Sequence, residues 1–311
     1  MTWPTDDALD ALYDELSTWG RWGDDDQGGM LAYLTPERRA AAARLVSSGV
    51  TISLAHDLAL APNAEQPSPS LHHMLASGDA LDTSGIPGYE ATRDFVGTDV
   101  HGLGTTHLDA LCHMFVRGQM YNGGSPEQVP SSGAIRNTVM TLADGIVGHG
   151  VLLDVPGVLG VPYLEAGHAI TPDELETAER AHGLTVSAGD ILLISTGRDA
   201  RRTEAHGQLN PFMKGLAGLH PDCLRWLAHH EVSVLCGDGI SDLLPPRPGQ
   251  WSFPVHQIGI VGMGLHLIDN VRMDTLTGYC REQGRYEFLF SAAPLRIPGG
   301  TGSPVNPVAL L

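Results

Sequence analysis

The chain has 311 residues, of which 42% are hydrophobic and 17% are charged, so it can bury a sizeable core as one large domain or two closely joined ones. Its formal net charge of −18 repels phosphate backbones and anionic membrane surfaces, and we therefore expect neither nucleic-acid binding nor peripheral membrane binding. Lys214 is the only lysine, and its surroundings carry no strong strand or helix signal, so a Schiff-base mechanism is not expected.

The N-terminal part of the chain predicts two helices and one strand. Apolar residues at helical spacing predict a helix over residues 6–19. Thr35-Pro36 begins a second, alanine-rich helix, which Gly49 ends. Residues 50–58 are apolar or alternating and predict a strand, which begins the main body of the chain.

A long loop is predicted over residues 61–87, because this segment is rich in Pro, Ser and Gly. Long loops inside compact domains are often functional lids. His72 and His73 lie in this loop and either approach a substrate or are simply exposed, which is the commoner fate of a tandem pair.

The second half of the chain alternates predicted strands and helices. A helix that starts at Thr171-Pro172 and ends at Gly183 separates two short apolar runs. The other elements are predicted strands at 151–155, 191–196, 232–236 and 258–268, a helix at 221–231, and further β structure at 90–116 and 286–291. This alternation indicates the α/β class.

The cysteines indicate neither a disulfide framework nor a zinc knuckle. They are widely spaced and form no Cys-x-x-Cys pair, so we expect reduced, buried thiols at Cys112, Cys223, Cys236 and Cys280. A Cys112–His113 nucleophile is disfavoured, because neighbours on a strand point to opposite faces. The first residues lack a secretory pattern and no apolar run approaches the length of a membrane span, which predicts a cytoplasmic protein.

The densest group of reactive side chains lies between residues 101 and 113, where three histidines accompany one aspartate. On a strand, His107 and Asp109 would point to the same side and could converge on one metal ion. His113 follows after a turn and is a candidate proton shuttle, because the imidazole pKa is close to neutral. A single histidine is more often a core residue. A cluster of histidines is different, because leucine or valine would fill the same core space without polar groups that need partners. The cluster therefore favours a metal site.

The sequence THLDALCH at 106–113 resembles the H-x-G-T-H-x-D-x-x-x-H signature of the cyclase-like metal hydrolases, which include bacterial kynurenine formamidase and isatin hydrolase. Later segments resemble further blocks of this family in the same order. They are GDILLISTG at 189–197, GDG at 237–239, PVHQ at 254–257, IDN at 268–270 and GGTGSPVNP at 299–307. The resemblance therefore runs from about residue 50 to the end.

One position departs from the family signature. The slot of the first ligand histidine holds Leu103, which cannot bind a metal. His101 lies two residues earlier, and a bulge at Gly102 and Gly104 could bring its side chain to the ion. The resemblance implies two further ligands, His256 and Asp269, the latter an aspartate where smaller members carry glutamate.

The resemblance implies a swivelling β/β/α fold over residues 50–311, preceded by an N-terminal helical extension over 1–49. It also implies a homodimer or homotetramer. The expected activity is metal-dependent hydrolysis of a small-molecule amide, formamide, lactam or lactone. The ion, Zn or Mn, would be held by His101, His107, Asp109, His256 and Asp269, with His113 as general acid and base.

Two other functions stay open from the sequence. A lyase or cyclase could use the same metal to polarise a carbonyl, and a non-catalytic binding protein could have kept the fold after losing the ligand at Leu103.

Two other sequence features have structural interpretations. Asp238 either orients a ligand histidine or forms a turn, and the glycine-rich segment at 299–302 is expected to be a structural tail because no lysine follows it.

Overall fold

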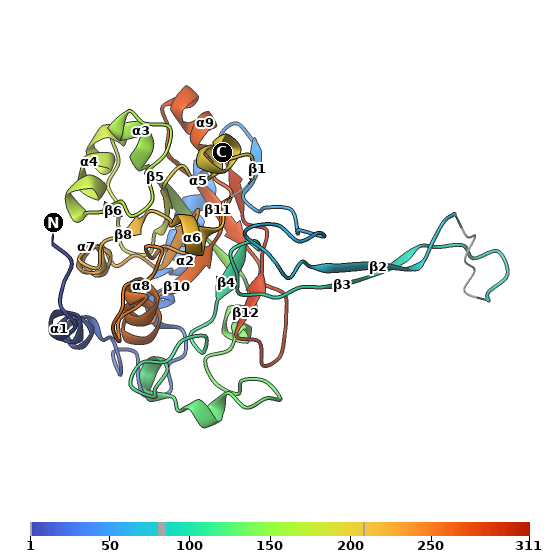
Figure 1. Ribbon diagram of the computed structural model, residues 1–311, viewed down its shortest axis with the longest axis horizontal. Coiled ribbons are helices and arrows are strands. Elements are labelled where there is room, and N and C mark those ends of the chain that lie inside the picture. The colour runs from blue at the N-terminus through green and yellow to red at the C-terminus, as the bar shows by residue number, and fades with distance from the viewer. Residues whose placement is uncertain (1, 80–84, 208) are drawn as a thin grey trace.

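The structure is a computed structural model that describes residues 2–79, 85–207 and 209–311, within which nine strands form one curled, mixed sheet (Figure 1). From one edge to the other, the strands are β1 (Thr51–Ser53), β13 (Val308–Leu310), β11 (Glu287–Ala292), β5 (Ile146–Asp154), β7 (Ile191–Ser195), β9 (Val234–Gly237), β10 (His266–Asp269), β4 (His107–Asp109) and β12 (Gly302–Pro304). Strands β5, β7, β9 and β10 are parallel, whereas the outer strands pair antiparallel. The expected α/β class is confirmed.

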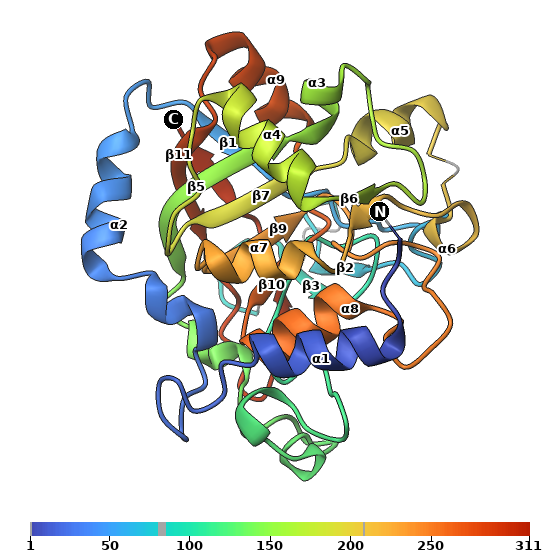
Figure 2. The same ribbon diagram turned by 90° about the vertical axis from the view of Figure 1, so that its left-hand side faces the viewer.

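Helices cover the sheet. They are α1 (Asp6–Leu16), α2 (Pro36–Ala42), α3 (Val155–Leu159), α4 (Pro172–His182), α5 (Arg198–Glu204), α6 (Pro211–Lys214), α7 (Cys223–His229), α8 (Pro254–His256) and α9 (Asp274–Gln283). Figure 2 shows α1, α4, α7 and α8 together on one face. Leu175 and Leu224 from this layer share a buried core with Leu235 of β9, whereas Leu276 of α9 packs with Phe288 in a second core.

Besides a small parallel sheet of β6 (Ala169–Ile170) and β8 (Gly218–Leu219), the described chain contains short helical segments. They are 3₁₀ turns at Gly29–Tyr33, Ala43–Leu45, Tyr121–Gly123, Pro126–Gln128 and Val139–Leu142, and a π-helix at Gln257–Met263. The strand expected over 258–268 is therefore wrong in its first part, because the chain forms the π-helix and becomes extended only at His266. This segment is buried on all sides, so its apolar pattern does not distinguish a helix from a strand. Gly262 lets it approach the ring of Tyr13, which a Cβ there would meet at 3.2 Å.

Part of the segment expected as a loop over 61–87 is a strand, whereas residues 61–70 are irregular as expected and residues 80–84 lie outside the described chain. β2 (Leu71–Ala76) pairs antiparallel with β3 (Arg93–Gly97), and this hairpin projects from the body as an arm (Figure 1). The strand is formed by the apolar residues Leu71, Met74, Leu75 and Ala76 and the two histidines between them, inside a segment that is otherwise rich in Pro and Ser. His72 and His73 lie on β2 and are exposed, and neither lines the pocket described below.

The N-terminal residues pack closely on the body. α1 begins at Asp6, as expected, but ends at Leu16, and Leu9 and Leu12 are buried in the core on that face of the sheet. α2 ends at Ala42, earlier than the expected stop at Gly49. Among the described residues, no helix combines the length and apolar character needed to cross a membrane.

Candidate metal centre

Strands β4 and β10 bring two carboxylates and one histidine to the same face of the sheet. In the antiparallel register Asp269 stands opposite His107, and Leu267 stands opposite Asp109. Paired residues share a face, so His107, Asp109 and Asp269 converge, as the strand argument from the sequence expects for the first two. All three side chains are buried.

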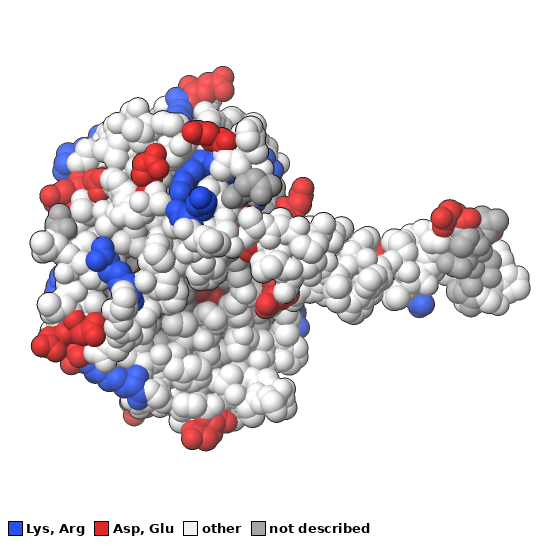
Figure 3. Space-filling model, in the orientation of Figure 1, with Lys and Arg blue, Asp and Glu red and all other residues white. Residues whose placement is uncertain are grey.

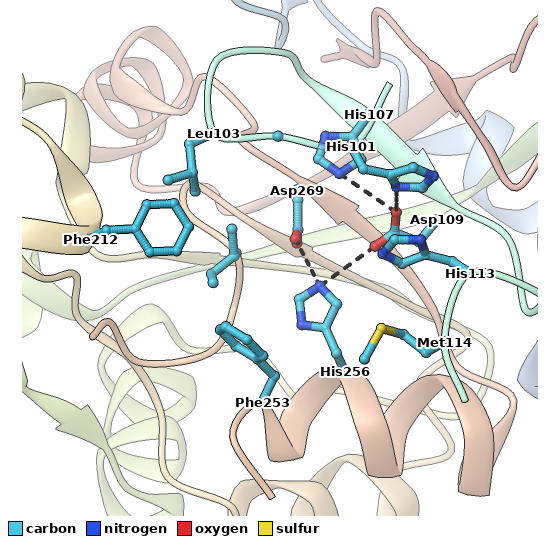
Figure 4. Close-up of a pocket in the computed structure, with 12 residues that line it drawn as sticks. His101, Leu103, His107, Asp109, His113, Met114, Phe212, Phe253, His256 and Asp269 are labelled. Atoms are coloured by element: carbon cyan, nitrogen blue, oxygen red, sulfur yellow. Dashed lines mark hydrogen bonds and ion pairs between the residues drawn. The ribbon is translucent and has the colours of Figure 1, made fainter. Parts of the chain in front are cut away.

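His107 is held in a fixed orientation. Its Nδ1 lies 2.8 Å from the carbonyl oxygen of Thr105, so this nitrogen carries the proton and donates it to the carbonyl. Its Nε2 is left as a free lone pair, 3.5 Å from Oδ1 of Asp109 (Figure 4). This orientation suits a metal ligand.

His101 reaches the same carboxylate from a turn. Its Nδ1 lies 2.8 Å from Oδ1 of Asp109, and its Nε2 lies 3.0 Å from Oγ1 of Thr301. The ring stacks on His113 at a centroid distance of 3.7 Å and an interplanar angle of 8°. His101 and His113 therefore lie side by side at the edge of the carboxylate cluster (Figure 4).

The backbone that carries His101 is not the bulged strand that the sequence predicts. Residues 101–106 form turns, and β4 begins only at His107. Leu103 points away from the carboxylates and packs with Leu216 and Leu244 in a small apolar cluster. The position that departs from the family signature thus forms part of an apolar wall.

His256 closes the cluster from α8 on the opposite side. Its Nε2 lies 3.2 Å from Oδ2 of Asp269 and 3.5 Å from Oδ2 of Asp109. Its Nδ1 lies 2.7 Å from Oδ2 of Asp242, and the two carboxylate oxygens of Asp242 also accept backbone hydrogen bonds from Val255 (Oδ1) and His256 (Oδ2). Asp242 therefore orients the imidazole, and no residue spacing in the sequence points to this role.

The protonation equilibria show how strongly these groups interact. Burial alone would raise the pKa of Asp109, but the hydrogen bond from His101 and the nearby imidazoles lower it well below its usual value. Burial would lower the pKa of His256, but the carboxylates of Asp269, Asp109 and Asp242 raise it well above its usual value. Burial raises the pKa of Asp269 despite the adjacent His256. Burial lowers the pKa of His113 to about 4, so this imidazole is neutral at pH 7.

The donor set fits a divalent cation. Oδ2 of Asp109 and Oδ1 of Asp269 are buried and accept no hydrogen bond from the described residues. Ligand atoms of His107, Asp109 and Asp269 lie within 4.8 Å of one another, as do those of His101, Asp109 and His113. Buried carboxylate oxygens that accept no hydrogen bond are costly without a cation, and mixed His and carboxylate ligation suits zinc or manganese.

A cavity of about 220 Å³ opens over the cluster. Its other walls are apolar and comprise Leu103, Met114, Phe212, Ile240 and Phe253 (Figure 4). No lysine or arginine is among the described residues that line it. The cavity therefore presents the polar groups on one side and an apolar surface on the other, as small-molecule sites commonly do.

Two residues for which the sequence left a catalytic role open, Asp238 and Cys112, have structural roles instead. The Asp238 carboxylate accepts hydrogen bonds from the backbone of Thr196 and Arg198 and from the Thr196 hydroxyl, so it stabilises the turn between β7 and α5 and orients no ligand histidine. Burial raises the pKa of the Cys112 thiol to about 12, and Cys112 packs in the core that lies away from the cavity. All four cysteines are free and buried, as expected.

The glycine-rich segment near the C-terminus has the structural role expected, with one addition. β12 pairs with β4, placing Gly302 opposite Asp109. A Cβ at Gly302 would meet the imidazole of His101 at 2.7 Å, so glycine leaves room for that ring. The neighbouring Thr301 contacts His101 directly, a contact that the sequence did not reveal.

Comparisons with known proteins identify the family of this chain. The family model described as "Putative cyclase" matches residues 51–241. A solved structure described as a novel cyclase is 30% identical, covers 95% of this chain and 100% of its own, and has a TM-score of 0.85. No curated protein matches the chain.

Two isatin hydrolase structures show the same fold at lower identity. One, bound to the product analogue thioisatinate, is 18% identical, with a TM-score of 0.60 and coverage of 88% of this chain and 96% of its own. Isatin hydrolase A from Ralstonia solanacearum is 22% identical, with a TM-score of 0.59 and coverage of 84% and 91%. The family match and the 30% identical structure together establish that this chain belongs to the putative cyclase family.

Proposed function

We propose that this protein is a metal-dependent hydrolase of a small, uncharged amide, formamide, lactam or lactone. The observation that carries the proposal is that two buried carboxylate oxygens, one on Asp109 and one on Asp269, accept no hydrogen bond from the described residues and lie beside imidazole nitrogens at the cavity. The fold shared with isatin hydrolases supports the same chemistry, because isatin is a cyclic amide.

Five residues would hold the metal, either zinc or manganese. They are His101, His107, Asp109, His256 and Asp269. When bound, such an ion lowers the pKa of water to about 7 and polarises a carbonyl group. Asp242 and the Thr105 carbonyl contact the Nδ1 atoms of His256 and His107 and so turn the Nε2 atom of each imidazole toward the cluster, where it would bind the ion in place of a proton.

His113 would move the proton. It is neutral at pH 7, so it can accept the proton of the attacking water and pass it to the departing nitrogen or oxygen. Leu103, Phe212 and Phe253 would hold the apolar body of the substrate and exclude bulk water. The absence of lysine or arginine among the described lining residues favours an uncharged substrate.

Metal content and turnover test the proposal together. Purified protein should hold at least about one zinc or manganese ion per chain. It should also hydrolyse at least one member of a panel of N-aryl formamides, lactams and lactones. His107→Ala and Asp109→Ala should each lose the metal, whereas the exposed His229→Ala should keep it. A protein without bound metal after zinc or manganese supplementation, and without hydrolysis of the panel, would refute the proposal.

We also propose, on the family resemblance, that the chain assembles as a homodimer or homotetramer and acts in the cytoplasm. The division into an extension at 1–49 and a domain at 50–311 remains a proposal on the same ground.

A further inference from the structure

A second cavity lies between α2 and the sheet and shares no lining residue with the cavity over the candidate metal centre. Figure 2 shows α2 beside β5 and β11, which supply part of its wall. Its volume is about 200 Å³, which is room for a small organic molecule because a water molecule occupies roughly 30 Å³. The residues that line this α2 cavity are Arg38, Ala41, Ala42, Leu45, His149, Asp190 and Glu287.

Arg38 brings an unpaired positive charge to the α2 cavity. Beside α1, basic and acidic side chains adjoin (Figure 3), as in the ion pair of 2.8 Å between Arg225 and Glu15. By contrast, the guanidinium of Arg38 makes no hydrogen bond or ion pair with any residue in the described ranges. The side chain is half-buried, and its stem lies over Gly189, where a Cβ would come within 2.6 Å of Cδ of Arg38. A guanidinium held in this way presents its donors to a carboxylate.

The sheet side of the α2 cavity is acidic. Nδ1 of His149 lies 2.9 Å from Oδ1 of Asp190, and its Nε2 lies 3.1 Å from Oε1 of Glu287. Oδ2 of Asp190 accepts a hydrogen bond of 2.8 Å from the backbone of Ser187, so both oxygens of Asp190 are occupied. Oε2 of Glu287 contacts no partner in the described chain, and this side chain is 39% exposed. Glu287 therefore has an oxygen that can accept a hydrogen bond from a ligand.

Opposite charges thus line one cavity without meeting, because no described carboxylate lies within ion-pairing distance of Arg38. A ligand with both an anionic and a cationic group would complete both partners. A ligand with only a carboxylate would be repelled by Asp190 and Glu287, and one with only an amine would be repelled by Arg38. Free α-amino acids carry both charges on adjacent groups, and Ala41 and Leu45 supply an apolar wall for a short side chain.

We propose that the α2 cavity binds a free α-amino acid with a small apolar side chain. Its carboxylate pairs with Arg38, its ammonium group pairs with Glu287, and its side chain packs on Ala41, Ala42 and Leu45. The bound amino acid then links α2 to β11. This second site shares no residue with the candidate metal centre, so it stands or falls independently of the hydrolase proposal.

Calorimetric titration of the purified full chain tests the class of ligand. At least one of alanine, valine and leucine should bind with a dissociation constant below about 1 mM. Analogues of the binder that lack one charged group should bind at least about tenfold more weakly. For valine these are 3-methylbutanoate, which lacks the ammonium group, and isobutylamine, which lacks the carboxylate. If none of the three amino acids binds, or if either analogue binds as tightly as its parent, the proposal is wrong.

Variants of α2 test where the amino acid binds. Arg38→Gln removes the partner of the carboxylate, and Ala41→Trp fills the cavity from an exposed position, so each should weaken binding at least about tenfold. Arg39→Gln and Ala40→Trp are matched controls, because both residues are exposed on α2 and neither lines the cavity; they should bind like the wild type. Binding that survives both cavity variants would place the amino acid elsewhere, such as the metal centre, and would overturn the proposal.

Discussion

The guanidinium of Arg198 donates a 3.0 Å hydrogen bond to the carbonyl oxygen of Leu103, and both side chains are buried. The same guanidinium contacts the side-chain oxygen of Asn270, whose amide nitrogen in turn donates to the carbonyl oxygens of Gly102 and Thr105. Backbone carbonyls between His101 and His107 are thus held by one buried polar network, which fixes the turn that carries His101.

Removing Arg198 should destabilise the protein strongly. Arg198→Met leaves the buried carboxylate of Glu65 with one less cation, and breaking a buried pair in this way costs about 3–5 kcal/mol of unfolding free energy. Arg202→Met removes the other, more exposed partner of Glu65 and should cost less than about 1 kcal/mol. Urea unfolding of both variants measures the difference. If the double variant Arg198→Met/Glu65→Gln recovers no stability, the loss does not come from the broken ion pair between Arg198 and Glu65.

How much of this site was predictable depends on how local each determinant is. His107 and Asp109 follow from strand periodicity within three residues, and the capped helix from Thr171 to Gly183 follows from its end signals. By contrast, Asp242 meets His256 only because of the loop that joins them, and Thr301 reaches His101 only because β12 pairs with β4. Such contacts depend on tertiary packing, which has no sequence period.

Asp242→Asn should weaken metal binding without unfolding the protein. The carboxylate fixes the tautomer of His256, and the loss of such a partner costs about 10- to 100-fold in metal affinity. Asp190→Asn is a matched control, because Asp190 is equally buried and pairs with His149 far from the cavity. Competition with a chelator measures the affinities. Equal affinities for the wild type and both variants would show that His256 needs no orientation by Asp242.

His149 should make the stability of the protein depend on pH. It lies 2.9 Å from Asp190 and 3.1 Å from Glu287; burial alone lowers its pKa, but these carboxylates raise the pKa above its ordinary value. A raised folded-state pKa stabilises the protein fully below the unfolded value, about 6.5, and this contribution disappears as the pH rises through the folded value. The wild type should therefore exceed His149→Gln in unfolding free energy by more at about pH 5.5 than at about pH 9. A difference that grows with pH would contradict this assignment.

The stacked pair His101 and His113 should separate metal binding from proton transfer. His113→Phe keeps an aromatic ring against His101 but removes the nitrogen that accepts a proton, so metal should be retained while turnover falls by about 10² to 10⁴. His101→Phe keeps the stack but removes the nitrogen beside Asp109, so metal should be lost. Elemental analysis and turnover of both variants give four possible outcomes. If metal is lost from the His113 variant and kept in the His101 variant, the two roles are exchanged. His113 would then bind the ion beside Asp109, and His101 would transfer the proton.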